Sequence, residues 1–386
     1  MTTKFTFLTL SLAFFGLSNN ANAQWVHPVT AATHVNCIVN KGDTLFFGES
    51  NGIAYSLDNG NTWTTSNLFG EDPYVTAITA IGNNMFAVNN GGAFYASNDN
   101  GLSFTKTDFT FNSINTIFAL GSSLFIGDDN TISESTDKGK TWTTRLTTAS
   151  KVNTFAVLGN TLYAGTKSEG IYVSTDNGKT WTVLASSTAI VDVMSFLMIG
   201  NNIYASSYKG GVYLSNDNGL TWTAKNNGFG AYLYIAAITV HKGVLYAASS
   251  YGGVYSSPDN GENWTAMNDG LTNLTTICMG SDSKRIYTGT FGGGIFYTTS
   301  NVTTVEENAI ATNGLYPNPS IDHLTIDKSD YQNTTLEVYN AQGSLLQSQL
   351  LTSSQTTIGT SSLATGVYLV KLSNSNGTTV SRFVKE

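Results

Sequence analysis

Residues 174–181 read STDNGKTW, and five further close copies of this octapeptide occur along the chain. The other copies begin at Ser56, Ser97, Ser135, Ser215 and Ser257. Each copy ends in Trp or Phe, and these closing aromatic residues follow one another at intervals of 38 to 42 residues. A repeat of about 40 residues with several short strands is typical of the blades of a β-propeller.

The fourth repeat shows how one blade is built. The runs VNTFAVLG, NTLYAGT, GIYVSTD and KTWTVLA, between residues 152 and 185, predict four strands from the centre outwards. Asp-Asn-Gly between the last two strands predicts a hairpin turn in which Gly178 adopts a positive φ. Asp176 is expected to accept hydrogen bonds from the turn, with help from nearby hydroxyl groups. The same structural role is predicted for the other box acids, which are Asp58, Asp99, Asp137, Asp217 and Asp259.

A seventh repeat lacks the octapeptide. Residues 286–300 align with three strands of the other repeats and then stop, whereas QWVHPVT at 24–30 places Trp25 where other repeats have their closing Trp. The N-terminal strand is therefore predicted to complete the last blade. The expected fold class is all-β: a seven-bladed propeller at 24–300, a linker at 301–310 and a small Ig-like β-sandwich at 311–386.

The two cysteines acquire a candidate role if the ring closes. Cys37 lies in the predicted inner strand of the first blade and Cys278 in that of the last. Inner strands are expected to approach closely there, because the residues aligned with Cys37 are small: Ala77, Thr116, Thr154, Ser195 and Ala237. A disulfide across the seam is one hypothesis, and two buried free thiols are the alternative.

The first 23 residues predict an exported protein. Lys4, an apolar run from Phe5 to about Leu17 and Ala21-Asn-Ala23 make up a secretory signal with cleavage before Gln24. The mature net charge is then −9, because the loss of Lys4 takes one positive charge from −8. The chain has no basic cluster that would neutralise nucleic acid and no other segment apolar enough to span a bilayer. A monomer without metal or cofactor is expected.

Two resemblances extend these predictions. The octapeptides resemble the Asp-box (S-x-D-x-G-x-T-W) of the bacterial neuraminidase repeat (BNR) family, which implies a peripheral hairpin away from the binding face. The tail, with Tyr316-Pro-Asn-Pro319, VYNAQGSLL, LATGVYLVKL and a terminal VKE, resembles the C-terminal sorting domain of type IX secretion in the Bacteroidetes. That resemblance implies recognition by the type IX machinery and a secreted or surface-attached protein.

The sequence gives little support for an enzyme. Sialidases of the Asp-box class bind the substrate carboxylate with three arginines, but the propeller contains only Arg145 and Arg285. Another glycosidase would need paired carboxylates, for which the candidates are Glu71, Asp72, Asp128, Asp129, Glu169 and Asp192. A calcium loop would need more acids than the box holds. The four dispersed histidines, His27, His34, His241 and His323, are interpreted as structural or exposed.

One asymmetry predicts a binding surface. The loops between second and third strands of blades five to seven carry Tyr208, Tyr251 and Phe291, and the connection before blade six adds Phe229, Tyr232 and Tyr234. Aromatic rings of this kind suit sugar faces or apolar peptide side chains. We therefore expect a glycan-binding or protein-binding propeller. A glycoside hydrolase or lyase, and an assembly or scaffold factor, are the alternatives.

Overall fold

The computed structural model describes residues 25–28, 34–66, 74–299, 315–327, 332–340, 345–374 and 377–386. These residues fall into two units, one within Met1–Val302 and the other within Thr303–Glu386. The expected signal peptide, the expected linker, Glu71 and Asp72 lie outside the described residues. Within those residues, no helix has the length and apolar character needed to cross a membrane.

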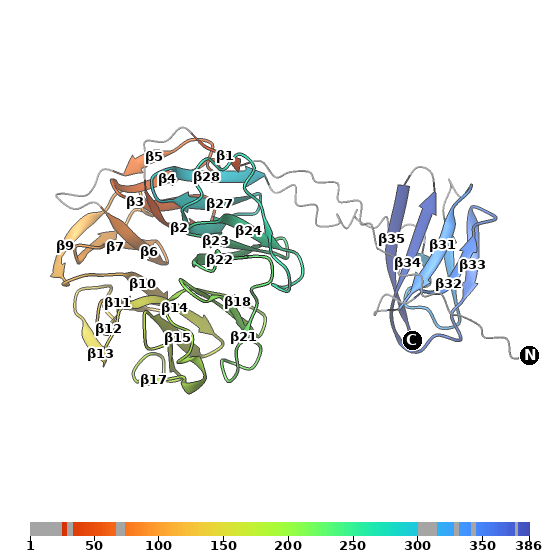
Figure 1. Ribbon diagram of the computed structural model, residues 1–386. Helices are drawn as coiled ribbons and strands as arrows, with labels where there is room; N and C mark the ends of the chain where they lie inside the picture. Colours follow the sequence, from red (N-terminus) through yellow and green to blue (C-terminus); the bar gives the residue numbers. More distant parts are fainter. Residues whose placement is uncertain are drawn as a thin grey trace, which may run out of the picture. The chain divides into compact units, whose positions relative to one another are not determined.

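The first unit is a propeller of seven sheets, each with four antiparallel strands (Figure 1). The inner strands are β2 (Val35–Lys41), β6 (Val75–Ile81), β10 (Thr116–Leu120), β14 (Val152–Leu158), β18 (Val193–Ile199), β22 (Ile235–His241) and β26 (Thr276–Ser281). The second strands are β3 (Thr44–Glu49), β7 (Asn84–Asn89), β11 (Ser123–Gly127), β15 (Thr161–Thr166), β19 (Asn202–Ser207), β23 (Val244–Ser249) and β27 (Arg285–Thr290).

In blades one to six, the two peripheral strands form the hairpin that carries the octapeptide. The third strands are β4 (Gly52–Ser56), β8 (Ala93–Ser97), β12 (Thr131–Ser135), β16 (Ile171–Ser174), β20 (Gly211–Ser215), β24 (Gly253–Ser257) and β28 (Gly294–Thr299). The outer strands are β5 (Thr64–Ser66), β9 (Thr105–Thr110), β13 (Thr143–Thr147), β17 (Thr182–Val183), β21 (Thr223–Ala224), β25 (Thr265–Ala266) and β1 (Trp25–Val26).

The core lies between the blades. Second strands are buried along nearly their whole length, and β15 reads TLYAGT with its last five residues buried, because both faces of each sheet meet a neighbouring blade. Phe86 and Phe94 of blade two, for example, pack in one cluster with Ile117 and Leu124 of blade three. Continuous apolar strands are thus explained by burial on two sides.

The N-terminal strand closes the ring, as the sequence predicts. In β1, Trp25 pairs with Thr298 and Val26 with Tyr297 of β28, so the last blade contains both ends of the propeller sequence. Trp25 is only 2% exposed and packs against Tyr246, Ile286 and Phe296. Inner strands β2 and β26 are neighbours across the seam.

The second unit consists of two sheets around one core. One sheet has the order β29 (Leu315–Tyr316), β30 (His323–Asp327), β33 (Gln355–Gly359). The other has the order β32 (Leu345–Leu350), β31 (Thr335–Tyr339), β34 (Gly366–Asn374), β35 (Gly377–Lys385). Leu324 and Ile326 of the first sheet share a buried cluster with Val338, Val370 and Phe383 of the second. The unit is a β-sandwich, and the Ig-like part of the expectation is not confirmed.

Candidate functional site

Seven residues occupy equivalent positions at or next to the start of the inner strands, and we call them the mouth ring because six of them, from six blades, line one open cavity, the channel mouth. They are Asn36, Thr76, Asn115, Asn153, Met194, Ala236 and Ile277. In six blades the mouth residue is the second residue of the inner strand, at a shift in register between the inner and second strands. A β-bulge redirects a side chain. This explains why the mouth residue faces the cavity although the neighbouring residues of the same strand pack between blades.

A cavity of about 440 Å³ lies at this mouth. Its lining includes six of the seven mouth-ring residues together with Tyr74, Asn90 and Lys151. Tyr74 and Lys151 immediately precede their inner strands, and Asn90 follows a second strand. Because strands alternate in direction within a blade, these positions share one face of the propeller, opposite the octapeptide hairpins. We call it the loop face.

The mouth ring is polar in blades one to four and apolar in blades five to seven. Three polar members donate to a backbone carbonyl at or just before the start of the next inner strand: Asn36 Nδ2 to Val75 O at 2.9 Å, Thr76 Oγ1 to Ile114 O at 3.0 Å, and Asn153 Nδ2 to Val193 O at 3.1 Å. Met194, Ala236 and Ile277 have no side-chain donor. The polar half of the ring therefore also connects neighbouring blades.

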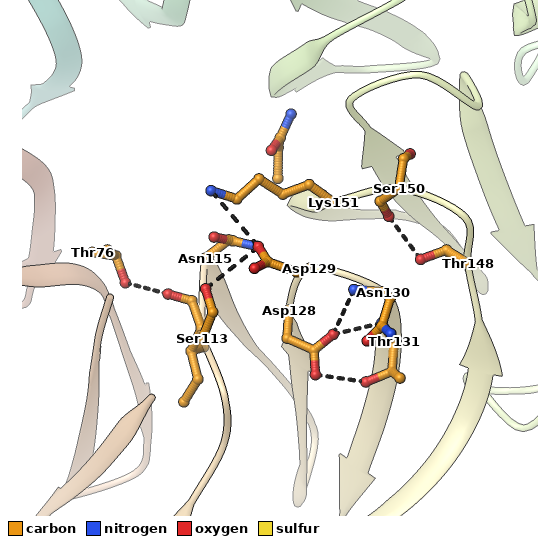
Figure 2. Close-up of polar contacts among 12 residues, drawn as sticks. Thr76, Ser113, Asn115, Asp128, Asp129, Asn130, Thr131, Thr148, Ser150 and Lys151 are labelled. Carbon is orange, nitrogen blue, oxygen red and sulfur yellow. Dashed lines mark hydrogen bonds and ion pairs between the residues drawn. The ribbon is translucent and has the colours of Figure 1, made fainter. Parts of the chain in front are cut away.

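Asp129 is the centre of a polar group beside the mouth (Figure 2). Its Oδ1 accepts hydrogen bonds from Asn115 Nδ2 at 3.3 Å and from Ser113 Oγ at 3.4 Å. The same oxygen lies 3.9 Å from Lys151 Nζ, and the Asp129 side chain is 62% exposed. The adjacent Asp128 accepts from the Asn130 and Thr131 amides at 2.8 and 2.5 Å, so it holds its own turn together.

The other candidate acids are also engaged. Glu169 Oε2 accepts from the Ala149 amide at 2.9 Å and thereby ties two loops together. Asp192 Oδ1 accepts from Asn153 Nδ2 at 3.3 Å. Asp192 precedes β18 with a φ of 55°, a conformation that is uncommon for residues other than Gly and Asn. Of the described candidates, Asp129 and Asp192 lie beside the mouth ring, whereas Asp128 and Glu169 are occupied in loop structure.

Three of the predicted aromatic residues form a cluster on blades five and six. The Tyr234 ring stands edge-on to both Tyr208 and Tyr251, with centroids 5.4 and 5.0 Å away. The Tyr208 and Tyr251 hydroxyls are 3.4 Å apart. The hydrogen bond to Tyr251, burial and the nearby Asp192 raise the pKa of Tyr208 to about 12. Asp192 thus lies next to both this tyrosine cluster and Asn153 of the mouth ring.

Two further predicted aromatics are exposed, and one is not. Phe291 of blade seven is 53% exposed and stands edge-on to His34 at 4.2 Å, and Tyr232 is exposed beside Gly252. Phe229, in contrast, is 1% exposed and stacks on Trp264 with centroids 4.8 Å apart. Its loop folds back onto the neighbouring blade, so Phe229 belongs to the core and not to a binding surface.

The octapeptides form self-contained hairpins. In blade four, Thr180 donates its amide and hydroxyl to Asp176 at 2.9 and 2.7 Å, and the Gly178 amide donates to Ser174 Oγ at 2.8 Å. Asn177 and Gly178 have φ values of 60° and 84°, as a type I′ turn requires. The other five boxes repeat the bonds between the Ser hydroxyl, the Asp carboxylate and the turn amides. Local hydrogen bonds account for this motif.

Cys37 and Cys278 occupy equivalent positions, paired with Gly48 and Gly289. A Cβ at either glycine would lie 2.6 or 2.4 Å from the corresponding sulfur, so each glycine leaves room for the thiol of its own blade. Across the seam, Cys278 Sγ lies 3.2 Å from Val35 O of β2, so the inner strands do approach closely here. Both cysteines are unbridged thiols in this structure. Burial raises the pKa of Cys37 to about 12 and that of Cys278 well above its usual value. The disulfide stays a hypothesis for experiment.

Both propeller arginines lie away from the mouth. Arg145 Nη2 pairs with Glu134 at 2.8 Å on the outer part of blade three. Arg285 donates to Asn59 O and Asn61 Oδ1 at 2.8 Å, beside the first octapeptide. Within the described ranges, no three His, Cys, Asp or Glu side chains come together as metal ligands. Burial lowers the pKa of His241, which lies in the core.

Comparisons with known proteins agree with both units. Residues 314–386 match the secretion system C-terminal sorting domain, and residues 172–183 match the BNR/Asp-box repeat. No curated protein matches the sequence.

Solved structures share the propeller fold at low identity. YCF48 from Cyanidioschyzon merolae is 15% identical with a TM-score of 0.58, over 72% of this chain and 98% of that one. A GH74 enzyme of Niastella koreensis is 19% identical with a TM-score of 0.54, over 70% and 44%. The extracellular domain of a putative hybrid two-component system from B. thetaiotaomicron is 16% identical with a TM-score of 0.59, over 94% and 54%. The chain thus spans about half the length of the latter two proteins.

These similarities establish the fold and indicate where the protein is exported. The propeller neighbours, each below 25% identity, support the architecture alone. The sorting domain at the C-terminal end indicates passage through the type IX machinery. The chain is an Asp-box β-propeller that carries a type IX sorting domain, and that domain indicates export to the cell surface or the extracellular space.

Proposed function

We propose that this protein is an extracellular carbohydrate-binding propeller whose loop face holds a glycan. The exported propeller is taken as residues 24–300, followed by the linker at 301–310 and the sorting domain at 311–386. The observation that carries the proposal is the group of aromatic side chains left in solvent beside the channel mouth. Tyr251 and Phe291 are 55% and 53% exposed, and Tyr251 is held in place by Tyr208 and Tyr234.

The chemistry of this surface favours a sugar. A pyranose ring offers an apolar face to an aromatic ring and hydroxyl groups to polar side chains around its edge. The tyrosine cluster supplies the rings, and the amides of the mouth ring lie next to it through Asp192 and Asn153. Sites of this kind combine apolar walls with a few fixed polar groups. Apolar side chains of a peptide would offer no donor to the amide oxygens of the mouth ring.

The test is a glycan array probed with the mature protein, followed by calorimetry with the sugars that bind. The triple variant Tyr208→Ala, Tyr251→Ala, Phe291→Ala should weaken binding at least about tenfold, because burying one large apolar side chain contributes about 1.5–3 kcal/mol. The matched control removes exposed leucines from the octapeptide face, Leu57→Ala with Leu220→Ala, and should bind normally. Binding that survives the triple variant, or a protein that binds no glycan, contradicts the proposal.

The hydrolase alternative depends on Asp129 and Asp192, the two described candidate acids beside the mouth. A panel of polysaccharides incubated with the protein tests it, with Asp129→Asn and Asp192→Asn as variants. Release of oligosaccharides that both variants abolish would establish the alternative. Binding without hydrolysis is the expected result.

A further inference from the structure

We infer that the channel mouth is a subsite for the hydroxyl-bearing edge of a neutral sugar, and that it discriminates against anionic glycans. This inference rests on the proposed carbohydrate-binding function and adds the class of sugar. It depends on three observations: how the mouth-ring amides are oriented, which charges surround them, and where the polar half of the ring ends.

The amides present oxygen atoms to the mouth. Asn36 Nδ2 donates to Val75 O and lies against the Tyr74 hydroxyl, so its hydrogens are directed into the protein. Asn153 Nδ2 donates to Val193 O and Asp192, and Asn115 Nδ2 donates to Asp129. A side-chain amide has two donor hydrogens and one acceptor oxygen. In Asn36 and Asn153 the scaffold engages the nitrogen with two partners, so Oδ1 is the atom of these two amides that is left for a ligand.

An acceptor-rich mouth selects ligands that donate. Sugar hydroxyls donate hydrogen bonds readily, whereas the carboxylate of a uronic acid or a sulfate group only accepts. An anionic group placed against these amide oxygens would lose its hydration without gaining a donor, which is unfavourable. The mouth ring therefore matches neutral hydroxyl groups better than charged ones.

The surrounding charges act in the same direction. Lys151 is the one charged residue in the lining of this cavity, and its ammonium group lies 3.9 Å from Asp129 (Figure 2). Asp192 adds a second carboxylate next to Asn153. The carboxylate of Asp129 thus offsets the positive charge of Lys151, which an anionic sugar would need as its partner. Asp129 and Asp192 together repel such a ligand.

The boundary between the polar and apolar halves of the mouth ring sets the orientation of the ligand. Polar mouth residues end with Asn153 in blade four, and the apolar ones begin with Met194 in blade five, where the tyrosine cluster also begins. A sugar placed across this boundary would turn its hydroxyl edge to blades one to four and its ring face to Tyr208 and Tyr251. Two separate features of the loop face agree on this orientation.

The chain itself suggests the variant that tests the amides. Thr76 has the equivalent position in blade two and makes the same bond to the next blade, at 3.0 Å. The double variant Asn36→Thr, Asn153→Thr should therefore keep the connection between blades while removing two amide oxygens. Its unfolding midpoint is compared with that of the unaltered protein, so that loss of binding is not mistaken for loss of fold.

Calorimetry of the mature full chain uses two sets of probes. The neutral set is cellohexaose, laminarihexaose, mannohexaose and xyloglucan oligosaccharides, and the anionic set is hexagalacturonate and hyaluronan hexasaccharide. We expect the neutral set to bind at least tenfold more tightly than the anionic set, and the double threonine variant to weaken neutral binding at least tenfold. Asp129→Asn keeps an acceptor for Ser113 and Asn115 but releases Lys151, and it should raise the affinity for the anionic set at least threefold.

The outcomes separate the two proposals. Anionic probes that bind as tightly as neutral ones, or neutral binding that depends on Tyr208 and Tyr251 but not on Asn36 and Asn153, would overturn the neutral subsite alone. A glycan array without any binding would overturn the carbohydrate-binding function, and the subsite with it. Failure of Asp129→Asn to raise anionic affinity would overturn the role given to that acid.

Discussion

Replacement of Trp25 by alanine should open the propeller at its seam. Strand β1 contributes only two residues to the last blade, and Trp25 supplies almost all of its buried surface. Truncation of a buried Trp to Ala costs about 3–5 kcal/mol, and loss of the 2.7 Å bond from Trp25 Nε1 to Met267 O adds about 1 kcal/mol. We expect the free energy of unfolding to fall by about 4–6 kcal/mol. For a domain of this size that corresponds to a decrease in Tm of roughly 8–20 °C.

Tryptophan fluorescence during thermal and urea unfolding measures this effect in the propeller alone. All six tryptophans lie between residues 25 and 264, so the sorting domain contributes no signal. Val26→Ala is the control on the same strand, because Val26 is exposed and its truncation should change stability by less than about 0.5 kcal/mol. Trp25→Phe should have an intermediate effect. The reasoning is refuted if Trp25→Ala is no more destabilising than Val26→Ala.

Three further outcomes are expected. Ser174→Ala removes the acceptor of the buried Gly178 amide and should lower stability by about 1–2 kcal/mol in urea unfolding; no change would show that the box bonds are dispensable. Hydrogen bonds from Thr62 hold the pKa of Asp58 at about 2, below its usual 3.8, and three other box acids share this value. Because the folded pKa is depressed, these acids stabilise the propeller above about pH 4, and the urea midpoint should decrease as pH falls from 4 to 2; a flat profile would contradict this. Finally, the raised thiol pKa values predict that Cys37 and Cys278 resist alkylation in the native protein. Because both cysteines are unbridged, two thiols should titrate after unfolding without reductant. A count of zero would establish the disulfide instead.

The architecture was predictable because the signals repeat. Six octapeptides in phase define the blade period, and the position of Trp25 relative to the last repeat predicts the closing strand. The turn chemistry is local, so Asp-Asn-Gly predicts positive φ values at Asn177 and Gly178 wherever the hairpin lies. Cys37 and Cys278 pair with Gly48 and Gly289, so the two cysteines occupy equivalent positions of the first and last blades.

The candidate site was only partly predictable. Tyr208 and Tyr251 follow equivalent second strands and Tyr234 immediately precedes inner strand β22, so the repeat places all three on the loop face. The path of the ten-residue connection between blades five and six cannot be read from residue spacing. The burial of Phe229 of this connection against Trp264 was therefore not predicted. The mouth ring was also missed, although its signal exists: in each repeat it is the residue just before the small position aligned with Cys37. A bulge turns that residue to the channel, and strict alternation would have assigned it incorrectly.

The mouth ring has a consequence for how such a protein can diversify. Six of its seven residues are carried by the same backbone bulge, while the octapeptide hairpins lie at the opposite end of the sheets. The ring and the hairpins are therefore at separate positions of each repeat. A substitution at one of the apolar mouth positions, Met194, Ala236 or Ile277, changes the ring without removing a side-chain bond between blades or a hairpin bond, so under the proposed function specificity can change there in a single step.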